Sequence, residues 1–255
     1  MSTDASMNAI ILAAGRGKRM RPLTDATPKP LLAVHGRPMV QWLADALSEG
    51  GLDRLVVNTE WLGEQVTAFF ESWNVAHPNV ALQFSHEGLD FGYALETAGG
   101  ISRALPMLGE VFWAMAGDVY VPEFDFSSST AASFAQSDQL AHLWLVPNPE
   151  HNPGGDFGLD DSGRALNVDA DQARQAGIPR YTFSTIALYK RALFEAPWSD
   201  VLPGNPQGTS APLAPLLRKA MDAGRVSAEL FDGAWMDVGT PERLAQINAA
   251  GQSHF

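Results

Sequence analysis

The 255-residue chain contains no cysteine, so disulfide bonds, thiolate metal sites and a cysteine nucleophile are all excluded. The absence of cysteine agrees with a reducing compartment. In addition, the residues before the first apolar run include an acidic side chain and no basic one, which is the reverse of a secretory signal. We therefore expect the protein to be cytoplasmic.

A long apolar run and a basic stripe are also missing. No apolar run approaches the roughly 20 residues that a membrane-spanning helix needs. The chain has 17 Lys and Arg against 29 Asp and Glu, a net charge of −12, and no cluster of basic residues that would suit a nucleic acid. The six histidines show no metal-ligand spacing, and there is no G-x-S-x-G motif for acyl hydrolysis. We expect neither a membrane nor a nucleic acid as a partner.

The first 120 residues alternate between short apolar runs and segments of helical periodicity. Strands are predicted at 8–14, 52–59, 80–85 and 111–116, and helices at 38–50, 63–73 and 98–105. Strands that alternate with helices indicate a parallel sheet with helices on both faces. The predicted fold class is therefore α/β, with a Rossmann-like, doubly wound, mixed but mostly parallel sheet.

The second half of the chain has a different pattern. Residues 127–130 open a helix or loop, strands are predicted at 140–146 and 226–231, and helices at 213–223 and 241–249. Two hairpin-like runs lie around 157–168 and 181–189. The segment 197–212 is rich in Pro, Gly and Ser, which makes it the best candidate for a mobile loop.

The stretch that follows the first predicted strand carries the clearest functional signal. Ligands of open α/β sheets bind at the carboxyl ends of the strands, which is where Gly15-Arg16-Gly17-Lys18-Arg19 lies. Glycines allow backbone N–H groups to approach phosphate oxygens, and four cations fall within six residues of an otherwise acidic chain: Arg16, Lys18, Arg19 and Arg21. The loop is neither a P-loop nor a G-x-G-x-x-G fingerprint. Taken alone, it could equally be a tight turn with solvated charges.

The continuation of this loop carries a family resemblance. Leu12 to Pro30 reads L-A-A-G-R-G-K-R-M-R-P-L-T-D-A-T-P-K-P. It resembles the signature of the sugar-1-phosphate nucleotidyltransferases, L-A-A-G-x-G-x-R-x-x-P-L-T-x-x-x-P-K-P, at every fixed position. The resemblance implies transfer of a nucleotidyl group from a nucleoside triphosphate to a sugar 1-phosphate, with release of pyrophosphate and assistance from Mg²⁺. With no internal repeat and no low-complexity tract, the chain is expected to be a single domain over 1–255, with a nucleotide-binding half at about 7–120 and a sugar-binding half at about 121–250.

The resemblance assigns roles to individual residues. Two cations are expected to be catalytic, Arg19 and Lys29, and two carboxylates at the ends of strands are expected to bind the metal, Asp118 and Asp237. The expected nucleotide contacts are Ala13, Ala14, Gly15, Gly17, Lys18, Glu87 and Gly99. The other expected substrate contacts are Asn58, Glu96, Asp156 and Ser184. Asn58 and Asp156 are expected on the sugar side, and Glu96 belongs to the run 95–100, which resembles the nucleobase-side loop of the family.

These residue types suit the chemistry, because two polyanions must meet while charge builds on the leaving pyrophosphate. Each residue also has a plain alternative role. Asp118 or Asp237 could cap a loop or helix, Glu96 could cap the helix after it, and Arg21 could pair with an acidic neighbour.

Weaker similarities point to a subgroup, the N-acetylmuramate-1-phosphate uridylyltransferases of cell-wall recycling. They are the runs at 60–63, 148–151, 155–157, 182–184 and 235–240. The expected substrates are UTP and N-acetylmuramate 1-phosphate. Alternatives are mannose 1-phosphate with GTP, glucose 1-phosphate with dTTP, or a non-catalytic relative that senses a nucleotide sugar. This chain differs from the subgroup in two places: it has Ser-Thr at 184–185, where the subgroup tends to have Ser-Gly, and its segment 197–212 is longer. The sequence does not indicate an oligomeric state.

Overall fold

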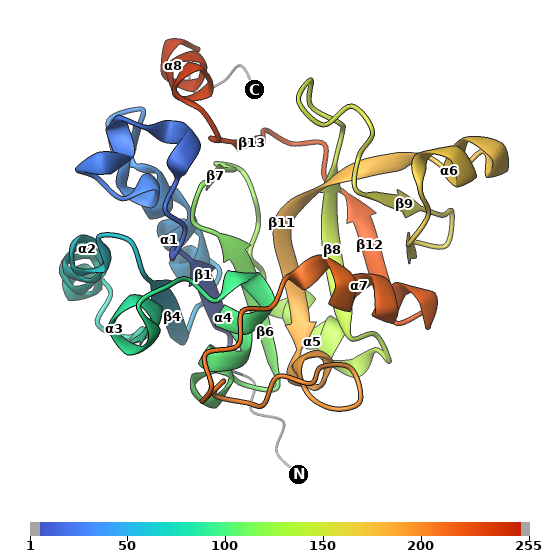
Figure 1. The fold of residues 1–255 in the computed structure, drawn as a ribbon, viewed down its shortest axis with the longest axis horizontal. Helices are drawn as coiled ribbons and strands as arrows, with labels where there is room; N and C mark the ends of the chain where they lie inside the picture. Colours follow the sequence, from blue (N-terminus) through green and yellow to red (C-terminus); the bar gives the residue numbers. More distant parts are fainter. Residues whose placement is uncertain (1–5, 251–255) are drawn as a thin grey trace.

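A mixed β-sheet forms the centre of the molecule in the computed structural model, which describes residues 6–250 (Figure 1). Its strands are β1 (Asn8–Leu12), β4 (Arg54–Thr59), β5 (Ala81–His86), β6 (Val111–Ala116), β8 (Ala141–Val146), β9 (Phe157–Leu159), β10 (Ala165–Leu166), β11 (Arg180–Lys190) and β12 (Val226–Leu230). The order is β10-β9-β11-β6-β1-β4-β5, and β8 joins β11 to β12. The predicted mixed α/β sheet is confirmed.

The first predicted strand is the central β1, which pairs in parallel with β4 and β6. Its side chains alternate between the two faces of the sheet. Ile11 packs into the core on one face and Ile10 into the core on the other, and both are fully buried. Burial on both faces explains why this strand reads as a continuous apolar run.

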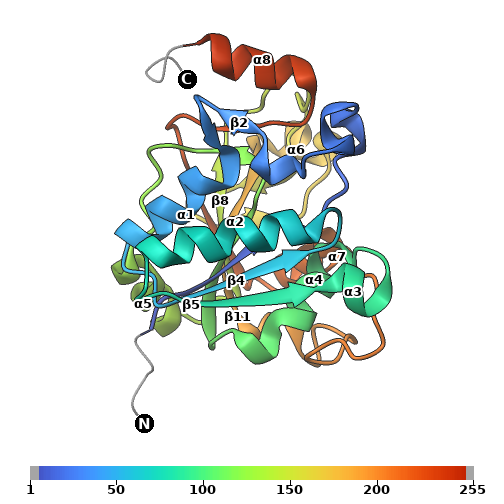
Figure 2. The same ribbon diagram turned by 90° about the vertical axis from the view of Figure 1, so that its left-hand side faces the viewer.

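Helices cover both faces of the sheet. One face is covered by α1 (Met39–Glu49), α2 (Gly63–Ala76) and α5 (Ser128–Gln136), and the other by α4 (Glu96–Ala104) and α7 (Leu213–Asp222). Figure 2 shows α2 running alongside β4 and β5. A last helix, α8 (Pro241–Ala249), begins where the hydroxyl of Thr240 accepts a hydrogen bond from the Arg243 N–H. The doubly wound arrangement is therefore confirmed.

The structure differs from the local predictions at β11 and at two short helices. The run at 181–189 is one long strand, β11, rather than a hairpin. Two helices were not predicted, α3 (Glu87–Phe91) and α6 (Ala170–Ala176). A sequence signal for α6 was present, because Asp169 and Gln172 form a capping box at its start. The hairpin expected around 157–168 exists as β9 and β10.

The chain topology gathers functional segments at one edge of the sheet. Because β1, β4 and β6 are parallel, their carboxyl ends lie at the same edge. Two short pairs lie outside the main sheet, β2 (Ala33–Val34) with β3 (Arg37–Pro38) and β7 (Val119–Tyr120) with β13 (Met236–Asp237). The second pair brings the C-terminal part of the chain to the end of β6.

No helix within residues 6–250 is both long and apolar enough to span a bilayer. Residues 1–5, on which part of the prediction about location rests, lie outside the described part of the chain.

Candidate active site

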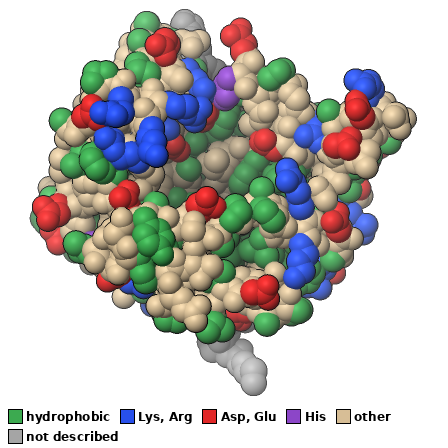
Figure 3. Space-filling model, viewed as in Figure 1, with side chains coloured by type: hydrophobic (Ala, Val, Ile, Leu, Met, Phe, Trp, Pro, Cys, Tyr) green, Lys and Arg blue, Asp and Glu red, His purple; other side chains and the backbone are tan. Residues whose placement is uncertain are grey.

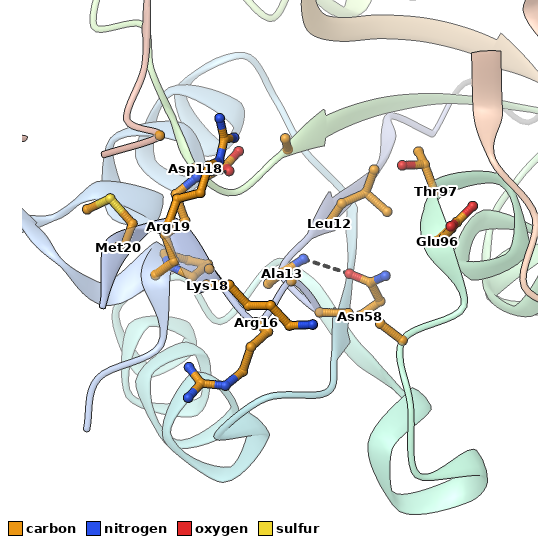
Figure 4. Close-up of a pocket in the computed structure, with 18 of the residues that line it drawn as sticks. Leu12, Ala13, Arg16, Lys18, Arg19, Met20, Asn58, Glu96, Thr97 and Asp118 are labelled. Atoms are coloured by element: carbon orange, nitrogen blue, oxygen red, sulfur yellow. Dashed lines mark hydrogen bonds and ion pairs between the residues drawn. The ribbon is translucent and has the colours of Figure 1, made fainter. Parts of the chain in front are cut away.

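A cavity of about 510 Å³ opens at the carboxyl ends of β1, β4 and β6 (Figure 4). Eleven of the predicted site residues line it: Ala13, Ala14, Gly15, Gly17, Lys18, Arg19, Lys29, Asn58, Glu87, Glu96 and Asp118. In Figure 4, Lys18 and Arg19 lie on one side, and Glu96 and Thr97 lie on the opposite side. The cavity therefore joins the basic loop to the wall formed at the start of α4.

The glycine-rich loop has a fixed shape with an open backbone. Gly17 adopts a left-handed conformation (φ +63°), and a Cβ there would lie 3.0 Å from the Thr24 methyl group and 3.1 Å from the Lys29 Cβ. The Thr24 hydroxyl donates a hydrogen bond of 2.9 Å to the Gly17 carbonyl. By contrast, a Cβ on Gly15 would meet nothing within 4 Å. Gly17 is thus required by the fold of the loop, whereas Gly15 leaves room for a ligand.

Two of the four loop cations serve the structure of the loop. Arg16 stacks over the Trp61 ring at 3.5 Å and donates hydrogen bonds to the Thr24 carbonyl (2.8 Å) and to Asp25 (2.9 Å). Arg21 donates to the same Asp25 carboxylate at 2.8 Å, as its alternative reading anticipated. Hydrogen bonds from Arg16 and then Arg21 lower the pKa of Asp25. Arg16 also lines the cavity, but its guanidinium is already engaged by Trp61 and Asp25, and Arg21 is not among the lining residues.

The other two loop cations are available. Within residues 6–250, the side chains of Lys18 and Arg19 have no hydrogen-bond or ion-pair partner, and both residues line the cavity. Figure 3 shows Lys and Arg side chains gathered along one rim of the central hollow. Unpaired cations beside an open glycine backbone form a site suited to a polyphosphate.

The end of β6 supplies an acidic group to the cavity. Asp118 forms an ion pair with the Nζ of Lys29, whose side chain is only 10% exposed, against 35% for the aspartate. The Val238 N–H donates to the Asp118 carbonyl at 3.0 Å, and Asp237 pairs with Val119 in the β7–β13 ladder. The two predicted metal-binding aspartates are thus brought together by adjacent backbone segments, although Asp237 itself is not among the cavity-lining residues.

Two residues around Asp237 were missed by the sequence analysis. Asp237 pairs with His151 (Nε2 to Oδ1, 3.0 Å) and with the guanidinium of Arg243. A Cβ on Gly239 would lie 3.1 Å from that guanidinium, so the close approach of Arg243 explains the glycine. His151 and Arg243 lie 92 residues apart in the chain. No local spacing could have joined them.

A buried polar chain supports the floor of the cavity. The Ala13 N–H donates to the Asn58 side chain at 2.6 Å, and Asn58 donates in turn to Glu87 at 2.6 Å. The second oxygen of Glu87 accepts the Leu95 N–H at 2.7 Å. Glu87 is fully buried, and this burial raises its pKa. Although Asn58 and Glu87 line the cavity, their polar groups already hold the end of β1 against the start of α4.

Three further predicted contacts lie away from the cavity lining. A Cβ on Gly99 would lie 2.5 Å from the Thr209 carbonyl, so this glycine packs against the segment 197–212. Asp156 accepts the Phe183 N–H at 2.8 Å. The buried Ser184 hydroxyl donates to a backbone carbonyl of β8 at 2.6 Å. The segment 197–212 lies along α4, and none of its residues lines the cavity.

A strained residue lies beside the cavity in β11. Thr185 has φ +70° at a bulge in this strand, and its hydroxyl accepts the N–H of the cavity residue Ala116 at 3.4 Å. A β-branched residue in the left-handed backbone region destabilises the folded state by about 1–2 kcal/mol. A glycine destabilises it by only about 0.5–1 kcal/mol, through the greater entropy of the unfolded chain. We expect Thr185→Gly to raise the free energy of unfolding by about 0.5–1 kcal/mol, measured by urea denaturation. A variant less stable than the wild type would contradict the interpretation that the Thr185 backbone is strained.

The chain is similar to several known proteins. The model of the nucleotidyl transferase family matches residues 8–253. An N-acetylmuramate alpha-1-phosphate uridylyltransferase of Neisseria meningitidis serogroup B is 41% identical over 246 residues, covering 95% of this chain and 97% of that protein. A Caulobacter vibrioides protein of the same name is 27% identical over 246 residues (94% and 95%). A crystal structure from Bacillus anthracis, in complex with sucrose, has a TM-score of 0.76 at 19% identity (98% and 97%), which is a likeness of fold alone.

Proposed function

The chain belongs to the nucleotidyl transferase family, and we propose that it transfers the uridylyl group of UTP to N-acetylmuramate 1-phosphate. The observation that carries the proposal is one cavity in which an open glycine loop with two unpaired cations faces Asp118. The similarity to the Neisseria protein supports the choice of sugar and base. A reaction that consumes UTP also favours a cytoplasmic enzyme.

The proposed reaction is a substitution at the α-phosphorus of UTP. A phosphate oxygen of the sugar 1-phosphate forms a bond to this phosphorus, while the bond to the β-phosphate bridging oxygen breaks and pyrophosphate leaves. The attacking phosphate is already ionised at neutral pH, so a general base is not needed. Catalysis then depends on positioning the two anions and neutralising their charge.

The cations of the cavity match this requirement. Lys18, Arg19 and the backbone at Gly15 are placed to hold the triphosphate and to stabilise the leaving pyrophosphate. Lys29 starts from a backbone held between two prolines, and its ammonium group already reaches Asp118. It is therefore placed beside the group that would hold the metal, where the α-phosphate and the sugar phosphate would meet.

The residues present fit a Mg²⁺ ion. Asp118 and Asp237 lie on adjacent backbone segments, and Mg²⁺ commonly takes one or two carboxylates together with phosphate oxygens and water. Within residues 6–250 no group of three or more acidic or histidine side chains is arranged as a metal cage, so substrate phosphates would complete the coordination. When bound, the ion would act as a Lewis acid and a template for the two substrates.

Mutation can distinguish a loop cation that contacts the substrate from one that stabilises the loop. Arg19→Ala is expected to lower kcat/KM about 100-fold, because it removes a charge-assisted contact to the triphosphate. Arg16→Ala is expected to lower the free energy of unfolding by about 1–2 kcal/mol and to change kcat/KM much less, because Arg16 is committed to Trp61 and Asp25. Steady-state kinetics and urea denaturation of both variants measure this split. Equal loss of kcat/KM in the two variants would contradict it.

Pyrophosphate release across a panel of substrates tests the proposed reaction. We expect fast, Mg²⁺-dependent release with UTP and N-acetylmuramate 1-phosphate, and slow release with N-acetylglucosamine 1-phosphate or glucose 1-phosphate. Faster release with GTP and mannose 1-phosphate, or with dTTP and glucose 1-phosphate, would overturn the substrate assignment and leave the reaction class standing. No release from any pair, together with measurable triphosphate binding, would point to a sensor of nucleotide sugars.

A further inference from the structure

The wall of the cavity opposite the basic loop contains a strained residue. Glu96 lines the cavity as the first residue of α4, and it has a left-handed backbone with φ +57°. L-residues other than Asn and Asp seldom adopt this conformation, which persists only where neighbouring structure holds it. Ala94 and Thr97, on either side, also line the cavity. The shape of this wall therefore depends on whatever holds the turn at Glu96.

The turn is held by the segment 202–211, which is distant in sequence. The Ala211 N–H donates to the Leu95 carbonyl at 3.0 Å, and the Ala211 carbonyl accepts the Gly99 N–H at 3.1 Å. One residue thus bridges both sides of the strained Glu96. The approach is so close that a Cβ on Gly99 would lie 2.5 Å from the Thr209 carbonyl. The segment is fitted to the turn at backbone level.

Asn205 anchors this segment. It is buried, and its amide donates to the Gly99 carbonyl (3.1 Å) and to the Thr209 carbonyl (2.8 Å). Its side-chain oxygen accepts the Thr209 N–H at 2.8 Å. A single buried amide therefore closes the segment onto itself and fixes it to the first turn of α4.

A second contact ties the segment to the residues before the turn. The Tyr93 hydroxyl donates to the Gly208 carbonyl at 2.8 Å. Gly208 has φ +65°, and a Cβ there would lie 2.5 Å from the Phe91 ring. The segment 202–211 therefore contacts both ends of the stretch 91–99 without lining the cavity itself.

We propose that Asn205 is a positioning residue for nucleotide binding, which acts through the segment 202–211 to hold the Glu96 turn. The inference rests on the proposed function, with the nucleotide bound at the basic loop and the Glu96 wall on the opposite side of the same cavity. The segment holds the wall in place through its contacts to Leu95 and Gly99 and does not itself line the cavity. Loss of the Asn205 amide would release the turn and weaken nucleotide affinity, while leaving the charged groups of the reaction in place.

The variant Asn205→Gly tests the proposal. Asn205 has φ +42°, which glycine adopts without strain, so the change removes the amide and leaves the backbone unhindered. We expect the Kd of UTP, measured by calorimetry without sugar phosphate, to rise about tenfold. The KM for UTP should rise with it, and kcat should change less than threefold. Amide hydrogen exchange of residues 94–100 should become at least tenfold faster.

A matched control separates positioning from a general loss of stability. Leu47→Ala removes buried side-chain atoms from α1, on the other face of the sheet, and should also destabilise the fold. It should leave the Kd of UTP and the exchange of residues 94–100 unchanged at a temperature where both variants are folded. An unchanged Kd in Asn205→Gly, or equal changes in the two variants, would overturn the proposal.

Failure of the proposed function is distinguishable from failure of this inference. If the wild-type protein releases no pyrophosphate from any pair, the proposed function fails. Hydrogen exchange still decides whether Asn205 holds the turn, because that measurement needs no nucleotide. If the wild-type protein is active, unchanged exchange at 94–100 in the variant overturns the inference alone.

Discussion

Asp118→Asn is expected to lower kcat about 1,000-fold at saturating Mg²⁺, because the reaction loses the carboxylate that the proposed metal needs at the end of β6. Asparagine keeps the size and shape of the side chain, so the protein should remain folded. Its Lys29 partner, only 10% exposed, would lose its counter-charge, so we expect the variant to be folded but less stable than the wild type. Steady-state pyrophosphate release and thermal unfolding of the same preparation measure the two effects.

The exposed Asp161 provides the matched control for this experiment. Asp161→Asn makes the same chemical change in a surface turn between β9 and β10, and it should keep wild-type kcat. A folded Asp118→Asn variant with near-normal kcat would rule out this carboxylate as the metal ligand. An Asp118→Asn variant that is inactive because it is unfolded would also contradict the expected result.

Glu87→Gln is expected to lower the free energy of unfolding by about 2–3 kcal/mol at pH 7, although it removes a buried charge. Both oxygens of Glu87 accept hydrogen bonds, one from Asn58 and one from the Leu95 N–H. A glutamine would place its own NH₂ group against either the Asn58 amide or the Leu95 N–H, so two buried hydrogen-bond donors would face each other without an acceptor. Urea denaturation measures the difference. The exposed Glu71→Gln in α2 is the control, and it should be neutral.

The effect of Glu87→Gln should depend on pH. Burial raises the pKa of Glu87 above its usual 4.5, so the folded protein binds this proton more tightly than the unfolded chain does. Stability from this group is therefore complete below pH 4.5 and is lost as the pH rises through the raised pKa. The difference in free energy of unfolding between wild type and Glu87→Gln should therefore become smaller as the pH rises from 4.5 to 7. A Glu87→Gln variant more stable than the wild type at pH 7 would contradict the expected result. It would show that burying the carboxylate charge costs more than its hydrogen bonds contribute.

The parts of the fold that local patterns encode could be predicted from the sequence. The double burial of β1 makes residues 9–12 a continuous apolar run, and the glycine loop after it stands where a parallel sheet places its ligands. The signature from Leu12 to Pro30 then placed Arg19, Lys29 and the glycines on one cavity. These features depend on neighbours in the chain, which is why they could be read without a structure.

Long-range contacts account for what the sequence could not predict. Asn205 contacts Gly99 across 106 residues, and Arg243 contacts His151 across 92. The composition of segment 197–212 predicted only a loop, and its hydrogen bonds to α4 could not be foreseen from it. An acidic partner for Arg21 was an open alternative in the sequence, but the engagement of Arg16 by the same Asp25 was not predicted; together these pairs leave Lys18 and Arg19 as the available cations.

Phosphorus-31 NMR of one reaction mixture tests the central claim most directly. The mixture contains the protein, Mg²⁺, UTP and N-acetylmuramate 1-phosphate, and a parallel sample contains a chelator. We expect the UTP signals to be replaced by those of pyrophosphate and of a diphosphate-linked sugar nucleotide, and we expect the chelator to stop this change. Unchanged UTP and sugar phosphate signals with Mg²⁺ present, from protein that binds UTP, would contradict the assignment of this cavity to nucleotidyl transfer.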